Sequence, residues 1–136
     1  GPNLFYDSVL QRRRCCGVRK VEPLRRALDG AAAWITGMRR EQSHERSDIP
    51  FVEWDDTYGL IKANPLADWT SEQVREYLQM HKVPCNLLHE RGFLSIGCAP
   101  CTRAVGPDDD PRSGRWWWEQ GTVKECGLHH LREEGS

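Results

Sequence analysis

The spacing of apolar residues along the chain predicts two helices. From Cys15 to Leu28 these residues recur at near-helical spacing, and Asp29-Gly30 is a typical helix stop. Pro23 predicts a boundary or a kink within that span. A second helix is predicted to begin at Thr70-Ser71-Glu72-Gln73, which has the spacing of a capping box, and Pro84 is expected to end it.

Three short segments have the pattern of β-strands. Ala31 to Thr36 is apolar and is predicted to be a buried strand, closed by Gly37. Ile49 to Trp54 alternates between apolar and polar residues, and Leu60 to Ala63 is a third candidate strand. The polar loop from Met38 to Arg46 follows the carboxyl end of the first strand, which is where open α/β sheets bind ligands. A solvated surface loop is the alternative interpretation.

Residues 106–136 differ in pattern from the rest of the chain. Gly106 to Pro111 is an acidic, turn-rich linker, and further glycines follow it. We therefore expect a main α/β domain at residues 1–105 and a flexible C-terminal arm at residues 106–136, which carries Cys126. Three adjacent tryptophans, Trp116 to Trp118, are expected to pin part of the arm onto the domain or to shield a site from water.

Composition narrows the functional classes. The 136 residues suffice for one modest domain, and the net charge of −1 gives no reason to expect nucleic-acid or membrane binding. Fifteen arginines against four lysines favour bidentate recognition of sulfate, phosphate or carboxylate, although a coding bias toward arginine explains the same excess. No apolar run is long enough to span a membrane and no signal peptide opens the chain, so we expect a cytoplasmic protein.

Six cysteines without a secretory signal indicate a reducing compartment, where metal binding or catalysis is commoner than a disulfide framework. The adjacent Cys15 and Cys16 and the C-x-x-C pair of Cys98 and Cys101 offer four thiols for one metal site. Spacing alone leaves a Zn²⁺ site, an iron–sulfur cluster, and disulfides or unrelated thiols open. Adjacent cysteines suit a cluster better than a single ion, because each sulfur then binds a different iron. Cys85 is isolated and is predicted to be a small buried residue.

Six motifs resemble those of one known family. They are Cys15-Cys16-x-x-Arg19-Lys20, Ala33-Trp34-Ile35-Thr36-Gly37-x-Arg39, Lys62-x-Asn64-Pro65-Leu66, Ser95-Ile96-Gly97-Cys98-x-Pro100-Cys101-Thr102-Arg103, Gly114-Arg115-Trp116-Trp117-Trp118-Glu119 and Lys124-Glu125-Cys126-Gly127-Leu128-His129. Over nearly its whole length the chain resembles the C-terminal half or more of an assimilatory adenylylsulfate reductase of the bacterial, thioredoxin-dependent type. The resemblance implies an α/β fold: part of the three-layer, adenine-nucleotide-hydrolase-like domain of the adenylylsulfate and phosphoadenylylsulfate (PAPS) reductases, with a mobile C-terminal arm.

The resemblance also implies a reaction. Enzymes of this type convert adenosine 5′-phosphosulfate to sulfite and AMP during sulfate assimilation and cysteine biosynthesis. Cys126 matches the catalytic nucleophile, which becomes an S-sulfocysteine before thioredoxin releases sulfite. Lys124 and a protonated His129 are expected to lower the pKa of its thiol.

Further site residues are carried over from the same motifs. Cys15, Cys16, Cys98 and Cys101 match the ligands of a [4Fe-4S] cluster that does not itself deliver the electrons. The positions that match substrate-contacting residues are Lys20, Arg39, Arg46, Arg112, Arg115 and His129. Lys20 is expected to link cluster and substrate electrostatically. Arg12 is left outside the predicted site, because some relatives have histidine there. The implied partners are adenosine 5′-phosphosulfate and thioredoxin, not nucleic acid or a membrane, and a homo-oligomer is left open.

One feature of the family is missing from the sequence. The family opens with a Gly-rich Ser-Gly-Gly-x-Asp-Ser-like loop that cradles phosphate through backbone amides. We therefore expect a fragment of a longer reductase, with the cluster ligands and the nucleophile but without the full nucleotide pocket. Two alternatives stay open: reduction of 3′-phosphoadenylylsulfate by the same mechanism, and a non-catalytic Zn-binding structural module. The complete cysteine set favours the nucleotide without the 3′-phosphate.

Overall fold

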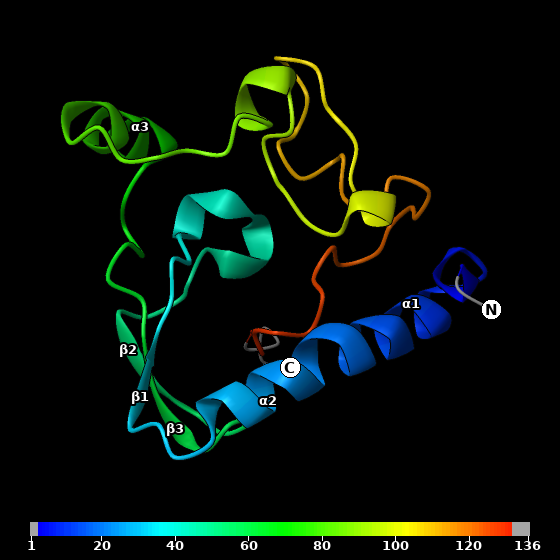
Figure 1. Ribbon diagram of the computed structural model, residues 1–136, viewed down its shortest axis with the longest axis vertical. Coiled ribbons are helices and arrows are strands. Elements are labelled where there is room, and N and C mark those ends of the chain that lie inside the picture. The colour runs from blue at the N-terminus through cyan, green and yellow to red at the C-terminus, as the bar shows by residue number, and fades with distance from the viewer. Residues whose placement is uncertain (1–2, 132–136) are drawn as a thin grey trace. The chain divides into compact units, whose positions relative to one another are not determined.

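The computed structural model describes residues 3–131, in which helices and a small mixed sheet confirm the predicted α/β class (Figure 1). The chain forms two units, and neither is continuous in sequence. The first combines the residues up to Met38 with Asp48–Ala67 and the segment from Glu125 onward. The second combines Arg39–Ser47 with Asp68–Lys124. The predicted boundary between residues 105 and 106 and the predicted mobility of residues 106–136 stay predictions, and residues 132–136 lie outside the described residues.

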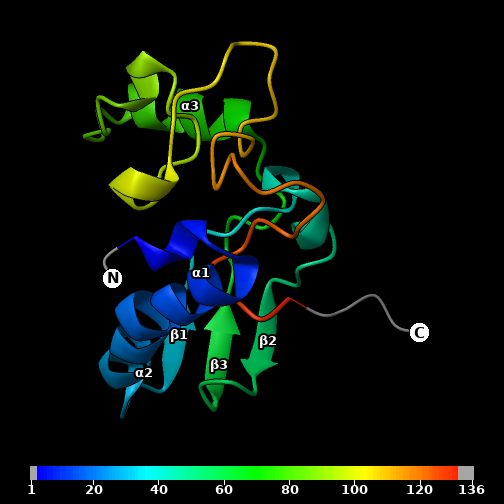
Figure 2. The same ribbon diagram turned by 90° about the vertical axis from the view of Figure 1, so that its right-hand side faces the viewer.

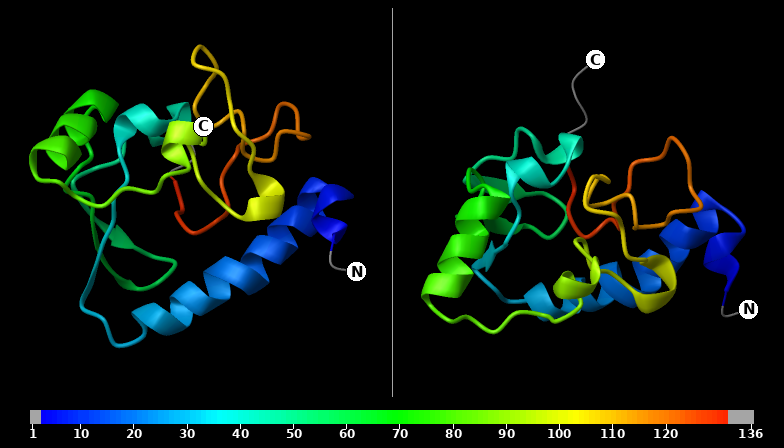
Figure 3. Two further views of the ribbon diagram at one scale, coloured as in Figure 1. Left: turned by 45° about the horizontal axis from the view of Figure 1, so that its top comes forward. Right: turned by 90° about the horizontal axis from the view of Figure 1, so that it is seen from above.

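A long helical rod opens the first unit. It comprises α1 (Val9–Cys16), a π-helical turn at Gly17–Val21 and α2 (Glu22–Leu28), which form one continuous ribbon in Figure 3. The predicted end at Leu28 is confirmed, but the helix begins earlier than predicted, at a Ser8 cap that accepts a hydrogen bond from the Gln11 amide at 3.2 Å. Pro23 cannot donate a backbone hydrogen bond, and the preceding turn is widened accordingly.

The three predicted strands form one sheet in the order β1-β3-β2. β1 (Ala33–Ile35) runs parallel to β3 (Leu60–Ala63), and β2 (Val52–Asp55) runs antiparallel to β3 (Figure 2). The register aligns Trp34, Lys62 and Glu53 across the three strands. Because side chains alternate between faces, Trp34 and Lys62 share one face.

The opposite face of the sheet is apolar and exposed. The prediction that the first strand is buried is wrong, because Ile35 on β1 is 73% exposed. Val52 and Trp54 on β2 and Ile61 on β3 are exposed on the same face. The strand is apolar on both faces, whereas the described chain covers only one of them.

A buried polar pair joins the ends of β1 and β3. Asn64 is 0% exposed; its Oδ1 accepts a hydrogen bond from the Thr36 hydroxyl, and its Nδ2 donates to the Pro50 carbonyl at 2.9 Å. Close by in the sequence, Met38, Ile49 and Ala67 form a small buried cluster against which Leu131 packs. The last described residue of the chain therefore packs against this unit's core.

The second unit contains α3 (Ser71–Met80). Its predicted capping box is confirmed, since Thr70 and Gln73 exchange both hydrogen bonds. The helix ends at Met80, before the predicted stop at Pro84, and it has no buried residue. Cys85 is exposed, so the prediction that it is buried is wrong. Within residues 3–131, no helix combines the length and apolar character that crossing a membrane requires.

The C-x-x-C motif lies in a short turn of the second unit. Cys98 precedes a 3₁₀ turn at Ala99–Cys101, and Thr102 then pairs with Arg115 in an isolated antiparallel bridge. The Trp116 amide donates to the Cys101 carbonyl at 2.9 Å. The tryptophan-rich motif is thus attached directly to the C-x-x-C turn, with Trp116 buried.

Candidate active site

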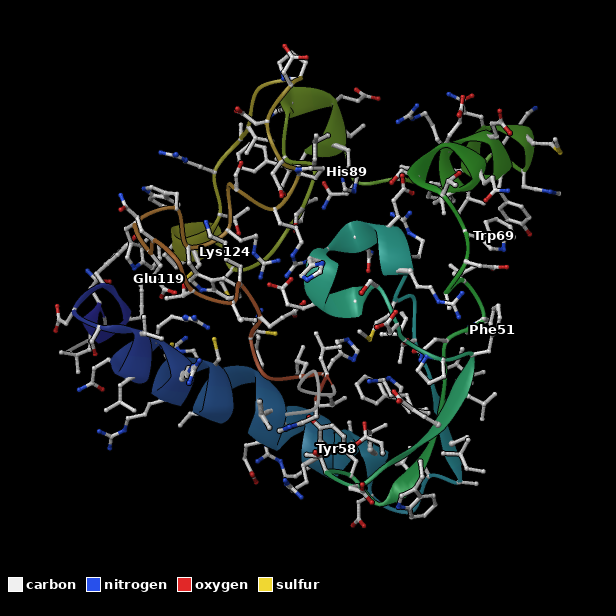
Figure 4. The ribbon with its side chains drawn as sticks, turned by 180° about the vertical axis from the view of Figure 1, so that it is seen from behind. Phe51, Tyr58, Trp69, His89, Glu119 and Lys124 are labelled. Carbon is white, nitrogen blue, oxygen red and sulfur yellow. The ribbon has the colours of Figure 1, made fainter. Side chains whose placement is uncertain are left out.

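Cys126 lies in the first unit, on a segment fixed at several points. Arg12 Nη1 donates to the carbonyl of Glu125 at 2.7 Å, directly before Cys126 in the chain. The Tyr58 hydroxyl donates to the Leu128 carbonyl at 3.2 Å. Figure 4 shows Tyr58 next to this segment. Residues 125–131 are therefore held on both sides of the thiol.

The helical rod brings two predicted cluster ligands close to the predicted nucleophile. Burial raises the pKa of the Cys16 thiol above its ordinary value, and the neighbouring Cys126 raises it further, while Lys20 and Arg12 oppose the rise. A smaller upward contribution comes from Cys15. Cys16 is buried, whereas Cys15 and Cys126 are partly accessible. This unit thus holds three of the predicted cysteines together with two cations.

Arg12 is a site residue that the sequence prediction left out. It is 1% exposed, whereas its neighbours Arg13 and Arg14 are exposed. A signal was present in the sequence, because Arg12, Cys16 and Lys20 are spaced by four residues and so share one face of a helix. The run of three arginines concealed that one of them is oriented differently from the other two.

His129 stacks on the sheet of the same unit. Its imidazole lies parallel to the indole of Trp34, with ring centroids 4.9 Å apart and an interplanar angle of 8°. Trp34 in turn meets the edge of Tyr58 at 5.5 Å. The predicted contact of His129 with the substrate stays a prediction. The structure adds its stacking on Trp34, which the sequence did not indicate.

The polar loop after β1 places Arg39 and Arg46 in the second unit. Arg46 is buried, and its Nη1 donates to Gln42 Oε1 at 2.6 Å. Arg39 Nη1 lies 3.2 Å from the Ser71 hydroxyl and 3.5 Å from a Glu41 carboxylate oxygen. Local groups therefore orient both guanidinium groups.

Arg115 is a buried cation beside the C-x-x-C turn. It is 6% exposed, its guanidinium lies 4.7 Å from the Trp116 ring centroid, and its Nη1 lies 3.4 Å from both the Ser95 hydroxyl and the Ile96 carbonyl. Its Nε is buried without a hydrogen-bond acceptor. A buried guanidinium held by neutral groups is suited to binding an anion.

Arg112 and Lys124 lie near the end of the second unit (Figure 4 labels Lys124 and Glu119). Arg112 Nη2 donates to the Lys124 carbonyl at 2.6 Å, and Lys124 Nζ donates to the Ser113 carbonyl at 3.3 Å. Burial lowers the pKa of Lys124, and the carboxylates of Glu119 and Asp110 oppose this shift. The predicted effect of Lys124 on the Cys126 thiol stays a prediction.

The predicted site residues are thus divided between the two units. All six cysteines are free thiols. Soft thiolates of this kind suit Zn²⁺ or an iron–sulfur cluster, so the donor chemistry fits either. Among residues 3–131, no three His, Cys, Asp or Glu side chains gather as a ready metal site. The first unit holds Cys15, Cys16, Lys20, Cys126 and His129, and the second holds Arg39, Arg46, Cys98, Cys101, Arg112 and Arg115.

Comparison with known proteins assigns this arrangement to a family. Residues 2–104 match the phosphoadenosine phosphosulfate reductase domain. The chain belongs to the phosphoadenosine phosphosulfate reductase domain family. This confirms the predicted relationship at the level of the family, which includes relatives named adenosine 5′-phosphosulfate reductase.

Two such relatives show how much of the chain is shared. The adenosine 5′-phosphosulfate reductase of Rhizobium tropici is 57% identical over 136 residues, which are 100% of this chain and 75% of that protein. The enzyme of the same name from Allochromatium vinosum is 58% identical over 125 residues, 92% of this chain and 49% of that protein. The chain therefore spans three quarters of the first relative and about half of the second.

A solved structure supports the fold of this reductase-domain chain. The phosphoadenylyl-sulfate reductase of Candida auris, solved as a phosphate complex, superposes with a TM-score of 0.55 at 36% sequence identity. The match covers 65% of this chain and 41% of that one.

Proposed function

We propose that this chain is part of a reductase that converts adenosine 5′-phosphosulfate to sulfite and AMP, with Cys126 as the nucleophile. The observation that carries the proposal is 57% identity, over all 136 residues, to a relative named adenosine 5′-phosphosulfate reductase. The names of the relatives favour this nucleotide over its 3′-phosphorylated form. The place of the reaction is sulfate assimilation for cysteine biosynthesis, in the cytoplasm.

The first step is transfer of a sulfonate group to Cys126. The thiolate attacks the sulfur of the sulfate group, an S–S bond forms, and the bond from sulfur to the bridging phosphate oxygen breaks. AMP leaves with that electron pair, and Cys126 becomes an S-sulfocysteine. A thiolate is needed, because the protonated thiol is a poor nucleophile.

The second step uses two electrons from an external dithiol, which we propose to be thioredoxin. One of its thiolates attacks the Cys126 sulfur, and sulfite leaves with the electrons of the cleaved S–S bond. The second thiol of the reductant then resolves the mixed disulfide, so that Cys126 returns to a thiolate and the reductant becomes a disulfide.

Cations must reduce the repulsion between a thiolate and an anionic sulfate group. We propose that Arg115 is one of these cations, because its buried guanidinium is held by neutral groups. The other proposed substrate-binding residues are Lys20, Arg39, Arg46, Arg112 and His129. Arg39 and Arg46 are fixed by local hydrogen bonds, which lowers the entropic cost of binding an oxoanion.

We further propose that Cys15, Cys16, Cys98 and Cys101 hold a [4Fe-4S] cluster. When bound, the cluster supplies a local charge that tunes the substrate site and is not the electron donor. Lys20, one helical turn beyond Cys16, adds a positive charge on the same side of the helix. Cys126 stays free for chemistry.

The proposed reaction is tested by sulfite release. Anaerobically purified protein, in the longest form that the coding sequence gives, is incubated with thioredoxin and each of the two nucleotides. The expected result is sulfite from adenosine 5′-phosphosulfate, with AMP in equal amount. A strong preference for the 3′-phosphorylated nucleotide would overturn the choice of substrate, and no sulfite from either nucleotide would overturn the proposed activity.

A further inference from the structure

We propose that Tyr58, Trp34 and Arg12 are positioning residues that hold residues 125–131 in a closed position and so place the Cys126 thiol. The proposal rests on the proposed function for the role of Cys126 as nucleophile. Its structural part, the attachment of the segment by three side chains, stands on observed contacts alone.

Tyr58 is fixed before it meets the segment. It lies in the turn between β2 and β3, where the Asp55 carboxylate accepts hydrogen bonds from the amides of Thr57 at 3.0 Å and Tyr58 at 3.2 Å. The Arg25 guanidinium lies 5.7 Å from its ring centroid. Burial raises the pKa of Tyr58, and Asp55 raises it further, so the phenol remains a neutral donor toward the Leu128 carbonyl.

Trp34 supplies a flat surface for the same segment. Its indole stacks on the His129 imidazole at 4.9 Å and meets the Tyr58 ring edge-on at 5.5 Å. Lys62 Nζ lies 5.3 Å from the indole centroid, and Lys62 is itself buried and paired with Glu53 at 3.7 Å. The indole that stacks on His129 is therefore itself packed against a buried, ion-paired lysine.

Arg12 completes the attachment on the other side of Cys126. It is buried in α1, and its Nη1 donates to the Glu125 carbonyl at 2.7 Å. Between the two attached carbonyls, Gly127 adopts φ +87°, a conformation that side chains disfavour. The three contacts, at Glu125, Leu128 and His129, bracket the thiol.

The types of contact that the three side chains make are those expected for positioning residues 125–131. Two of the three groups bind backbone carbonyls, so they fix the path of the chain and not the identity of its side chains. The Tyr58 hydrogen bond and the Trp34–His129 stack are individually weak, whereas the Arg12 hydrogen bond has a charged donor and is the strongest of the three. A segment held in this way is ordered when closed, and it can still open when an external thiol must reach Cys126.

The test compares substitutions with matched controls on the whole chain. Tyr58→Phe removes only the hydroxyl, and Trp34→Leu removes the stacking surface. The controls are Tyr77→Phe on exposed α3 and Trp54→Leu on the exposed face of the sheet. Residue-resolved hydrogen exchange of the amides of 125–131 and alkylation of Cys126 by iodoacetamide, quantified by mass spectrometry, report opening of the segment.

Tyr58→Phe is expected to raise exchange at 125–131 and Cys126 alkylation by about fivefold, as loss of one hydrogen bond implies, and Trp34→Leu by at least as much. Hydrogen exchange in β2 and β3 should stay unchanged in Tyr58→Phe. If Tyr58 had a purely structural role, exchange in these strands would rise as well. Wild-type behaviour of both variants, or equal changes in the controls, would overturn the inference.

The outcome is separable from that of the proposed function. If wild-type protein forms no sulfonate adduct on Cys126 while the variants expose the segment, the positioning inference stands and the proposed chemistry fails. If the adduct forms but the variants change neither exchange nor alkylation, the chemistry stands and the positioning inference fails. In adduct-forming protein, Tyr58→Phe should slow adduct formation without weakening nucleotide binding.

Discussion

The guanidinium of Arg115 occupies the space that a β-carbon on Gly97 would need. Gly97 directly precedes Cys98, so the buried cation and the C-x-x-C turn are packed without room for a side chain between them. The glycine of this motif therefore lets the Arg115 guanidinium lie here; a special backbone angle is not the reason for it, because its φ is not positive.

Gly97→Ala is expected to displace the flexible Arg115 guanidinium and to lower the free energy of unfolding by about 1 kcal/mol, as loss of its contacts with Ser95 and Ile96 implies. Urea unfolding followed by tryptophan fluorescence measures this change. Gly37→Ala is the matched control, since a β-carbon there meets no atom within 4 Å. Equal stability of the two variants would contradict the close packing at Gly97.

Asn64→Ala is expected to cost about 1–3 kcal/mol of stability, because it leaves the buried Thr36 hydroxyl and the Pro50 carbonyl without their partner. Thermal unfolding in parallel with Asn86→Ala, an exposed asparagine, provides the measurement and its control. If both variants unfold at the same temperature, the polar pair at the ends of β1 and β3 contributes nothing specific.

Tyr58 predicts a pH dependence with a definite sign. Its pKa is raised above the ordinary value of 10.0, so the folded state retains the phenol proton more strongly than the unfolded state. The stabilising contribution is complete below pH 10.0 and decreases as the pH rises further. The difference in unfolding free energy between wild type and Tyr58→Phe should therefore be constant from neutral pH to about pH 9 and then shrink. A difference that grows above pH 10.0 would contradict the role of the half-buried Tyr58 phenol as a neutral donor.

Metal content distinguishes the cluster from a zinc module. Anaerobically purified protein is expected to be brown and to contain iron and labile sulfide, whereas a colourless, zinc-containing protein would contradict the cluster. Cys98→Ser and Cys101→Ser should each lose most of the iron, because thiolate ligation is required. Cys85→Ser, which alters an exposed thiol, should retain it.

The elements that were predicted correctly have local signals. The Thr70–Gln73 capping box, the stop after Leu28 and strand β3 each depend on a few adjacent residues. The start of the long helix was missed because Val9 and Leu10 are followed by four polar residues and form no repeating apolar face, so that only the Ser8 cap marks the start. The prediction that β1 is buried was wrong, because the apolar composition of a strand does not reveal whether both faces of its sheet are covered.

The sequence motifs identified several residues of the candidate site but not the contacts that hold them. Motif matching named Cys126 and Arg115 but gave no reason for the close packing at Gly97. It also left out Arg12, and it gave Tyr58 no role, although the structure attaches both to the Cys126 segment. These contacts join residues 113 and 70 positions apart in the sequence, and no local pattern encodes such distances.

The proposed reaction requires that Cys126 takes a sulfonate group from a nucleotide. Its most direct test is peptide mass spectrometry of anaerobically purified protein incubated with adenosine 5′-phosphosulfate without reductant. We expect an SO₃ adduct on the Cys126 peptide that thioredoxin removes as sulfite, and no adduct in Cys126→Ser. Sulfite formation by Cys126→Ser, or an adduct on a different cysteine, would contradict it.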